Sequence, residues 1–547
     1  MIALLLGACG SGESRIAQGD REGILHFGNG TEPQGLDPHV VTGIPEMHVI
    51  VALFEGLVTK NPNTLEPEPG VAKRWNISED GLTITFYLND NAKWSNGDPV
   101  TAYDFVWSWQ RALSPKMGNQ YAYMLYPVKN AEAFATGEIT DFSEVGVMAK
   151  DAQTLVVTLN APTPYFIQLM DHQSTYPVHR QTIEKFGNAF DRFTPWTRVE
   201  NIVSNGAFRL TDWKLNRRIE VTKSDTYWDR DKVELNGVVF YPTENISTEE
   251  RMFRVGQLHR TESIPLDKIP VYRAMQNSPY VNSSYLGTYY YLFNTSEPPL
   301  DNLNVRKALS LAIDRRQLTE TVLHGSALPA YSITPPGTLG YQPPKVFEHD
   351  VQRAQELLAQ AGYPDGKGWP GLELVYNTSE SHLKVAVALQ QMWKDALNID
   401  ITLANEEWKV YLDTVDQMDF QMARRGWIGD YVDPNNFLDL FLCEGGNNST
   451  GFCDPVYDDM ILQQAPRATT REARYAIFQA AETRLMEQMP IVPIYTYTSN
   501  HLIQPGVKGL SSNVMDWINF KYISLDQDQD QDQNQGQGQG QGQEIVD

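Results

Sequence analysis

The sequence predicts an α/β protein that is built from more than one lobe. Its 547 residues are too many for one compact hydrophobic core. Stretches that alternate like strands are interleaved with stretches that have helical periodicity, a pattern typical of α/β proteins. Hydrophobic residues make up 41 % and charged residues 20 % of the chain, which excludes a wholly disordered protein.

The first half of the chain has the clearer strand signals. Residues 83–88 alternate apolar and polar side chains, as a half-buried strand does. A turn follows at residues 96–99, and Thr101 is then positioned to cap a helix that continues through Arg111. A second strand-rich region covers residues 202–241, with Asn205 and Gly206 as its turn signal.

The second half has the stronger helix signals. We expect three helices: residues 304–324 before Gly325, residues 351–361 before Gly362, and residues 471–489 before Pro490. Short strands are expected between these helices, at residues 372–376 and 491–495. No internal repeat is visible.

The charge of the chain excludes some partners. Lys and Arg number 44 against 68 Asp and Glu, which gives a formal charge of −24. Such a surface repels phosphate backbones, so we expect no nucleic-acid binding. No apolar run approaches the length of a membrane-spanning helix. Phosphate-binding loops, nucleophile elbows and zinc-protease motifs are also absent, and we expect no catalytic residue, no metal site and no cofactor.

The two ends of the chain differ from the body. Residues 1–9 form an apolar run that ends in small residues and Cys9, and a Gly/Ser spacer follows. This segment resembles the lipobox of bacterial lipoprotein signals, which implies export, lipidation of Cys9 and membrane attachment by the lipid alone. The alternative is a frayed terminus with a chance cysteine. At the other end, residues 525–547 are dominated by Asp-Gln and Gly-Gln repeats, and we expect this tail to be disordered.

The remaining cysteines, Cys443 and Cys453, bracket a polar loop that is rich in glycine. In an exported protein the compartment is oxidising, so the pair favours a disulfide over two free thiols. Half of a metal site is the third possibility, but no C-x-x-C motif and no nearby histidine supports zinc.

Several motifs are spread along the chain. They are residues 30–39 (GTEPQGLDPH), 53–57 (LFEGL), 70–75 (GVAKRW), 92–109 (AKWSNGDPVTAYDFVWSW), 205–208 (NGAF), 304–309 (NVRKAL) and 491–493 (IVP). Together these motifs resemble one family, the large solute-binding proteins of ATP-binding-cassette (ABC) importers that carry peptides. The likeness runs from about residue 25 to residue 524. Within the family, the sequence is most similar to the oligopeptide-binding subgroup.

The resemblance implies a two-lobed periplasmic-binding-protein-like fold of type II, in the large cluster with an extra inserted domain, and a hinged cleft that traps ligand. The implied division is a signal remnant and linker at 1–21, lobe I at 22–54, 180–286 and 498–524, an inserted domain at 55–179, lobe II at 287–497, and the tail at 525–547. It also implies a bacterial cell-envelope location, in the periplasm or on the outer face of the membrane. The expected partners are oligopeptides and the permease and ATPase subunits of an importer, and we expect a monomer.

The resemblance also implies a set of ligand-binding residues. Asp430 would hold the peptide ammonium group, and the backbone of Gly426, Trp427 and Ile428 would pair with the peptide as an added strand. Arg424 and His382 would bind the peptide carboxylate. The other implied contacts are the phenols of Tyr121, Tyr285 and Tyr290 and the main chain of Ile44.

Each of these residues also has a plainer interpretation. Asp430 can simply cap the turn before Asp433, Trp427 and the tyrosines can belong to the core, and Ile44 can be a buried aliphatic residue. Arg424 can be a solvated surface charge, and His382 can be structural.

Departures from the family pattern leave the ligand open. Val415 stands where relatives have a second arginine, and Thr42 stands where they have a glutamate. A murein peptide, a dipeptide or a signalling peptide therefore remains an alternative to a generic oligopeptide. A secreted hydrolase that uses Asp430 and Asp433 as an acid/base pair is the alternative of another class, and a sensor or holdase role is a further one.

Overall fold

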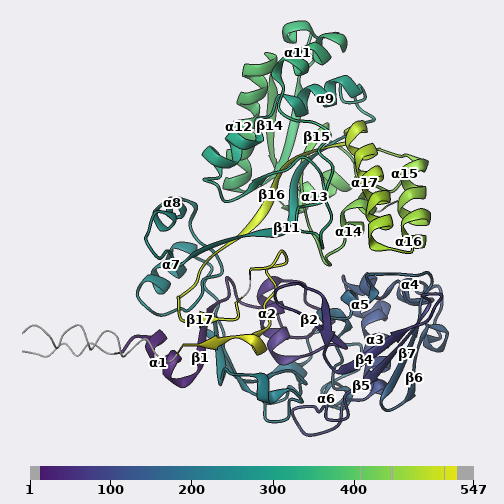
Figure 1. Ribbon diagram of the computed structural model, residues 1–547, viewed down its shortest axis with the longest axis vertical. Helices are drawn as coiled ribbons and strands as arrows, with labels where there is room; N and C mark the ends of the chain where they lie inside the picture. The colour runs from purple at the N-terminus through teal and green to yellow at the C-terminus, as the bar shows by residue number, and fades with distance from the viewer. Residues whose placement is uncertain (1–12, 407, 444, 446, 511, 527–547) are drawn as a thin grey trace, which may run out of the picture.

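The computed structural model describes residues 13–526 except 407, 444, 446 and 511, and it has two lobes, one above the other in Figure 1. Cys9 and residues 527–547 of the predicted disordered tail lie outside the described residues. The predicted α/β class is confirmed, since helices and sheets alternate in both lobes. The larger apolar clusters divide in the same way, with one core in each lobe.

The lower lobe contains two four-stranded sheets. The first has the order β1-β10-β9-β8, and its only parallel pair is β1 with β10. Its strands are β1 (Ile24–Gly28), β8 (Phe208–Lys214), β9 (Arg218–Lys223) and β10 (Gly237–Tyr241). The helices of this part are α1 (Arg15–Glu22), α2 (Ile44–Leu53), α6 (Arg180–Lys185), α7 (Ile246–Arg254) and α8 (Ile269–Arg273).

The second sheet of the lower lobe is antiparallel and has the order β4-β5-β7-β6. The elements of this part are β2 (Val58–Lys60), β3 (Pro67–Pro69), β4 (Ala72–Ile77), β5 (Thr83–Leu88), β6 (Val147–Asp151), β7 (Thr154–Thr158), α3 (Ala102–Leu113), α4 (Ala131–Thr136) and α5 (Phe166–Leu169). The predicted strand 83–88 and the helix after Thr101 are both confirmed. Thr101 and Asp104 form a capping box, in which the backbone N–H of Thr101 donates to Asp104 Oδ2 at 2.7 Å.

The upper lobe is built on one mixed sheet with the order β12-β16-β11-β15-β13-β14. Its strands are β11 (Tyr280–Phe293), β12 (Leu328–Pro329), β13 (Leu372–Asn377), β14 (Ile401–Glu406), β15 (Met422–Ile428) and β16 (Ile491–Leu502). Its helices are α9 (Leu303–Leu311), α10 (Arg315–Gln317), α11 (Val351–Gln360), α12 (Glu380–Leu397), α13 (Trp408–Asp416), α14 (Asn435–Leu438), α15 (Pro455–Asp459), α16 (Ala465–Arg467) and α17 (Arg471–Gln488). A small antiparallel pair, β17 (Val507–Lys508) with β18 (Ser524–Leu525), completes the described strands.

Two of the three predicted helices of this lobe are confirmed, as α11 and α17. The prediction of one helix over residues 304–324 is wrong, because α9 ends at Leu311 and a new helical segment begins after Asp314. The carboxylate of Asp314 accepts a hydrogen bond from the backbone N–H of Gln317 at 2.9 Å. This side chain caps a second start, and caps compete with helix continuation.

Strands β11 and β16 connect the two lobes (Figure 1). They pair from Tyr280 with Leu502 to Leu292 with Ile491, and the register shifts between Ser284 and Thr288. Strand β16 is therefore much longer than the predicted segment 491–495. The shift interrupts the pairing of the two strands near the middle of β11.

Candidate functional site

Strand β15 has an open edge that faces away from β11. It pairs with β11 along its whole length, from Met422 to Ile428, whereas β13 pairs with it only at Met422 and Ala423. Within the described residues, Arg424 to Ile428 thus have a strand neighbour on one side only. An edge of this kind can accept an extended peptide as an additional strand.

A cavity of about 640 Å³ lies between the lobes, next to the end of β15. Residues of both lobes line it. Those of the lower lobe are Tyr123, Met124, Tyr126, Pro127, Tyr165 and Leu169, and those of the upper lobe are Trp427, Asp430, Tyr431, Asn436, Asp439, Leu442, Gly445 and Asn447. Tyr123, on the 3₁₀ turn Ala122–Leu125, donates from Oη to Asp430 Oδ2 at 2.6 Å. The volume is in the range of ligand pockets, roughly 300–1,000 Å³.

Two carboxyl groups line this cavity, those of Asp430 and Asp439. Burial raises the pKa of Asp430 to about 6, against the opposing effect of hydrogen bonds from Tyr123 and Asn436. Burial also raises the pKa of Asp439 to about 7, and repulsion by Asp430 and Asp433 adds to the rise. Among the described residues, no cation lies close enough to either carboxyl group to favour its charged form.

A positive charge, that of Arg424, lies near the start of β15, at the other end of the open edge from Asp430. Arg424 donates from Nη2 to the hydroxyl of Tyr497 at 2.9 Å, and its guanidinium carbon lies 4.7 Å from the ring centre of Tyr289. No Asp or Glu among the described residues forms an ion pair with Arg424, and its Nε is buried without a hydrogen-bond partner. Arg424 is therefore not the solvated surface charge of the plainer interpretation.

His382, on α12, lies near the same group. Its ring centre is 5.6 Å from that of Tyr289, and its Nδ1 is buried without a hydrogen-bond partner. Burial lowers the pKa of His382 to about 4, and the positive charge of Arg424 contributes. An anionic ligand at this place would satisfy both side chains and would raise the pKa of His382.

The three strand residues predicted to pair with a peptide all lie along the open edge of β15. Trp427 lines the cavity and donates from Nε1 to Asn436 Oδ1 at 2.7 Å. Gly426 has no room for a side chain, since a Cβ atom would lie 2.6 Å from the hydroxyl of Tyr497. Ile428 is 40 % exposed and is paired with Gly287 of β11.

The predicted phenols are placed unevenly. Tyr121 lies beside Tyr123, with ring centres 5.9 Å apart, and burial raises its pKa to about 12. Burial also raises the pKa of Tyr285, and the carboxylates of Asp516, Glu262 and Asp430 add to the rise. Tyr290 is only 3 % exposed and packs edge-on against Phe441 in the upper core.

Ile44 is the first residue of α2 and is 45 % exposed. The alternative that it is a buried aliphatic residue is therefore wrong. The roles of Ile44, Tyr121, Tyr285 and Tyr290 toward a ligand stay predictions.

The arrangement of Asp433 argues against an acid/base pair. Arg474 binds the carboxylate of Asp433 with both terminal nitrogens, at 2.5 and 2.8 Å. Asp433, and not Asp430, also accepts from the backbone N–H of Asn435 at 2.9 Å, so the plainer role of capping the turn belongs to Asp433. No group of three or more metal-ligating side chains is found in the described part of the chain.

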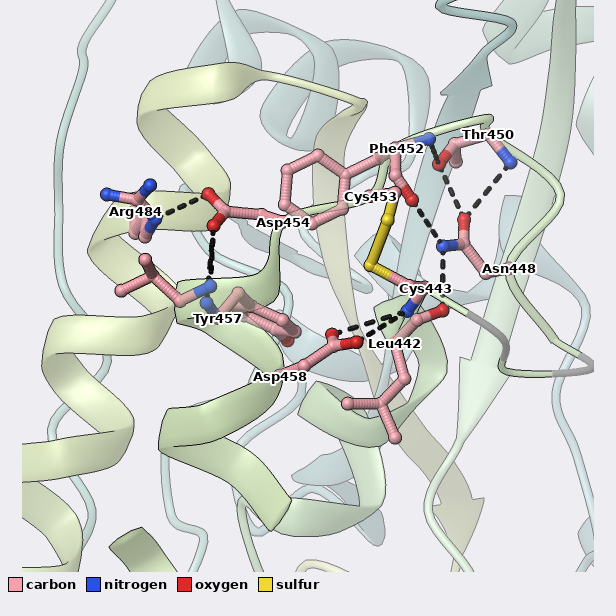
Figure 2. Close-up of a disulfide and its surroundings, with 11 residues drawn as sticks. Leu442, Cys443, Asn448, Thr450, Phe452, Cys453, Asp454, Tyr457, Asp458 and Arg484 are labelled. Atoms are coloured by element: carbon pink, nitrogen blue, oxygen red, sulfur yellow. Dashed lines mark hydrogen bonds and ion pairs between the residues drawn. A yellow bond between two sulfur atoms is a disulfide. The ribbon is translucent and has the colours of Figure 1, made fainter. Parts of the chain in front are cut away.

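The structure contains a disulfide between Cys443 and Cys453, whose Cα atoms are 4.4 Å apart (Figure 2). The loop that it closes is also held by Asn448, which donates to the carbonyls of Leu442 and Phe452. Leu442, Gly445 and Asn447 line the cavity. The disulfide thus stabilises one wall of the cavity.

Sequence patterns did not single out Tyr123, Asn436 or Asp439. Tyr123 is 307 residues from Asp430, and only the packing of the lobes brings them together. The spacing of Asn435 and Asp439, four residues apart within a helical turn, was the one local signal for a polar face here.

The comparisons with known proteins agree with this geometry. Residues 66–449 match the model of the bacterial extracellular solute-binding proteins, family 5 (middle region). The chain is 41 % identical to the periplasmic murein peptide-binding protein MppA of Escherichia coli over 88 % of this chain and 89 % of that one. It is 38 % identical to the periplasmic oligopeptide-binding protein OppA of Salmonella typhimurium over 88 % of both chains.

Among solved structures, the unliganded open form of the murein tripeptide binding protein MppA matches with a TM-score of 0.81 at 39 % identity, over 92 % of this chain and 97 % of that one. No helix in the described part of this chain is both long and apolar enough to cross a bilayer. The two-lobed fold expected from the sequence is confirmed. The chain belongs to the bacterial extracellular solute-binding proteins of family 5, which are extracytoplasmic, non-enzymatic binding components of peptide-carrying ABC importers.

Proposed function

We propose that this protein captures short oligopeptides outside the cytoplasmic membrane and delivers them to an ABC importer. The main support is the open edge of β15, with Arg424, which forms no ion pair with a described residue, near its start and the carboxylate of Asp430 just after its end. An extended peptide has the matching groups: a row of backbone N–H and C=O groups, an ammonium group and a carboxylate.

The placement of the charges defines a direction for the peptide. Its ammonium group would bind Asp430, and its carboxylate would lie near Arg424 and His382, so the peptide would run antiparallel to β15. Six residue steps of extended chain separate Arg424 from Asp430, roughly 20 Å. After the reach of both side chains is subtracted, peptides of about three to five residues fit this span.

Recognition through these groups is independent of peptide sequence. Backbone hydrogen bonds along the edge supply affinity for any extended peptide, and charge-assisted hydrogen bonds at the two ends select free termini. A murein peptide is the second candidate ligand, because MppA, at 41 % identity, is named for binding it.

Closure of the cleft would follow from the connection between the lobes. The pairing of β11 with β16 is interrupted between Ser284 and Thr288, at the predicted boundary between lobe I and lobe II. A bend there would move the upper lobe toward the lower one. The domain division predicted from the sequence is part of this proposal.

The test is calorimetric titration of the protein, purified free of ligand, with peptides that differ only at their ends. We expect trialanine, tetra-alanine or penta-alanine to bind, N-acetylation to weaken binding most, and C-terminal amidation to weaken it less. Equal affinity for free and doubly blocked peptides would contradict the proposal. Tighter binding of a murein tripeptide than of every α-linked peptide would favour the second candidate.

Attachment to the membrane is a separate part of the proposal. Cys9 would carry the lipid that its surrounding sequence predicts, and the protein would act as a monomer. Metabolic labelling with a fatty-acid analogue should mark the wild type and spare a Cys9→Ser variant. Sedimentation of the unlipidated protein should give the mass of one chain.

A further inference from the structure

The cavity beside β15 holds more negative charge than a peptide ammonium group requires. Asp430 suffices for one ammonium group, and Asp439 is a second carboxyl in the same cavity. None of the residues described as lining the cavity is a lysine, an arginine or a histidine. A ligand with a single positive charge would leave one carboxylate of the pair without a counter-ion.

The contacts of Asp439 do not neutralise it. Its carboxyl group accepts a hydrogen bond from the uncharged side chain of Asn435, whose Nδ2 lies 3.2 Å from Asp439 Oδ2. The nearby arginine, Arg474, is already bound by both of its terminal nitrogens to Asp433. Asp433 thus has a cationic partner, whereas Asp439 lines the cavity and forms no ion pair with a described residue.

The walls of the cavity suit a cation as well. Five of the lining side chains are aromatic, namely those of Tyr123, Tyr126, Tyr165, Trp427 and Tyr431. Tyr165 and Tyr431 stack across the lobes, with ring centres 4.6 Å apart and planes 12° from parallel. The faces and hydroxyls of such rings stabilise ammonium and guanidinium groups. The remaining wall, at Leu442, Gly445 and Asn447, is held by the neighbouring disulfide (Figure 2).

We infer that the cavity is a subsite for a cationic side chain on the first residue of the peptide, with Asp439 as its specificity-determining residue. This inference rests on the proposed function, which places the peptide ammonium group at Asp430. From there, the side chain of a first-position lysine, ornithine or arginine extends into the cavity and reaches Asp439. Peptides that begin with such residues bind more tightly than peptides that begin with a neutral side chain of equal length.

The experiment compares three tripeptides by calorimetry: Lys-Ala-Ala, norleucine-Ala-Ala and Ala-Ala-Lys. Norleucine matches the length of lysine without its charge, and Ala-Ala-Lys places the same charge at the other end. The proteins are the wild type, Asp439→Asn, and Asp419→Asn, which removes an exposed charge from the same lobe. We expect the wild type to prefer Lys-Ala-Ala over norleucine-Ala-Ala by about 10-fold, as for a buried charge-assisted hydrogen bond.

Asp439→Asn should abolish this preference, and Asp419→Asn should retain it. The inference is overturned if the wild type binds the lysine and norleucine peptides equally, a result that needs no variant to fold. It is also overturned if Ala-Ala-Lys gains as much as Lys-Ala-Ala, or if Asp439→Asn keeps the preference. Binding of neutral peptides without a lysine preference would leave the proposed function intact, whereas failure of the wild type to bind any peptide would remove both.

Discussion

The two ends of the open edge of β15 differ in charge and are alike in lacking an ion-pair partner among the described residues. At the anionic end, after Ile428, the cavity holds Asp430 and Asp439, and no cation is found among the described residues that line it. At the cationic end, Arg424 and His382 have buried nitrogens without hydrogen-bond partners, and no described carboxylate pairs with Arg424. Elsewhere in the same lobe, the buried pair Arg474 and Asp433 is bidentate and complete.

Under the proposed function, this difference separates charges that serve folding from charges that would serve a ligand. A buried charge without a partner costs stability, so a fold normally pairs it. Charges of opposite sign without ionic partners at the two ends of one open strand edge are unfavourable for the protein alone. A zwitterionic peptide would supply both counter-ions.

The largest effect should come from removing the anionic anchor. Asp430→Asn should weaken binding of a free tripeptide by at least about 30-fold, since truncating one partner of a buried charge pair costs about 2–5 kcal/mol. The exposed Asp419→Asn is the matched control and should bind as the wild type does. An Asp430→Asn variant with unchanged affinity, measured by calorimetry, would show that Asp430 does not bind the peptide ammonium group.

Loss of the disulfide should weaken ammonium binding at the anionic end and leave carboxylate binding at the cationic end unchanged. Replacing both Cys443 and Cys453 by serine should lower the free energy of unfolding by about 3 kcal/mol on the loop-entropy model. Urea unfolding measures this loss. Affinity should fall for peptides with a free ammonium group, while the penalty for C-terminal amidation stays as in the wild type. A change in that penalty would show that binding at the two ends of the edge is not independent.

The smallest effect concerns the pH dependence of the unliganded protein. The pKa of Asp439 is about 7 in the fold, above its value in an unfolded chain, roughly 4. Between these values the folded protein binds more protons than the unfolded chain, so the contribution of Asp439 to stability is lost as pH rises from about 4 to about 7. Asp439→Asn should therefore be more stable than the wild type at pH 8, by about 1–2 kcal/mol.

At pH 4 most of this gain should vanish, because the carboxyl group is then protonated in the folded protein and about half protonated in the unfolded chain. Thermal unfolding of the two proteins at pH 4 and pH 8 measures the difference. A constant difference between them at both pH values would contradict the raised pKa of Asp439 and the burial that causes it.

The sequence predicted those strands and helices whose formation depends on a few neighbouring residues. The strand 83–88 and the capped helix after Thr101 follow from alternation and from a capping box, both of which lie within a few residues. The break after Leu311 was missed because the periodicity of apolar residues continues through it, whereas the capping contact of Asp314 decides the structure.

Part of the site was predicted, but from family resemblance and not from local patterns. Asp430, Arg424 and the strand between them came from resemblance to a family, and no pattern in the sequence alone shows that their charges lack partners. Tyr123 and Asp439 were missed because the cavity forms only where the two lobes meet. The contact that joins the lobes there, between Tyr123 and Asp430, links residues that are 307 positions apart in the sequence.

A crystal structure of the protein with Lys-Ala-Ala bound would test the proposed binding mode most directly. We predict an extended peptide along the edge of β15, with its α-ammonium group on Asp430, its lysine side chain directed to Asp439, and its carboxylate toward Arg424 and His382. A peptide bound in the reverse direction, or one that leaves the edge from Arg424 to Ile428 unpaired, would contradict it.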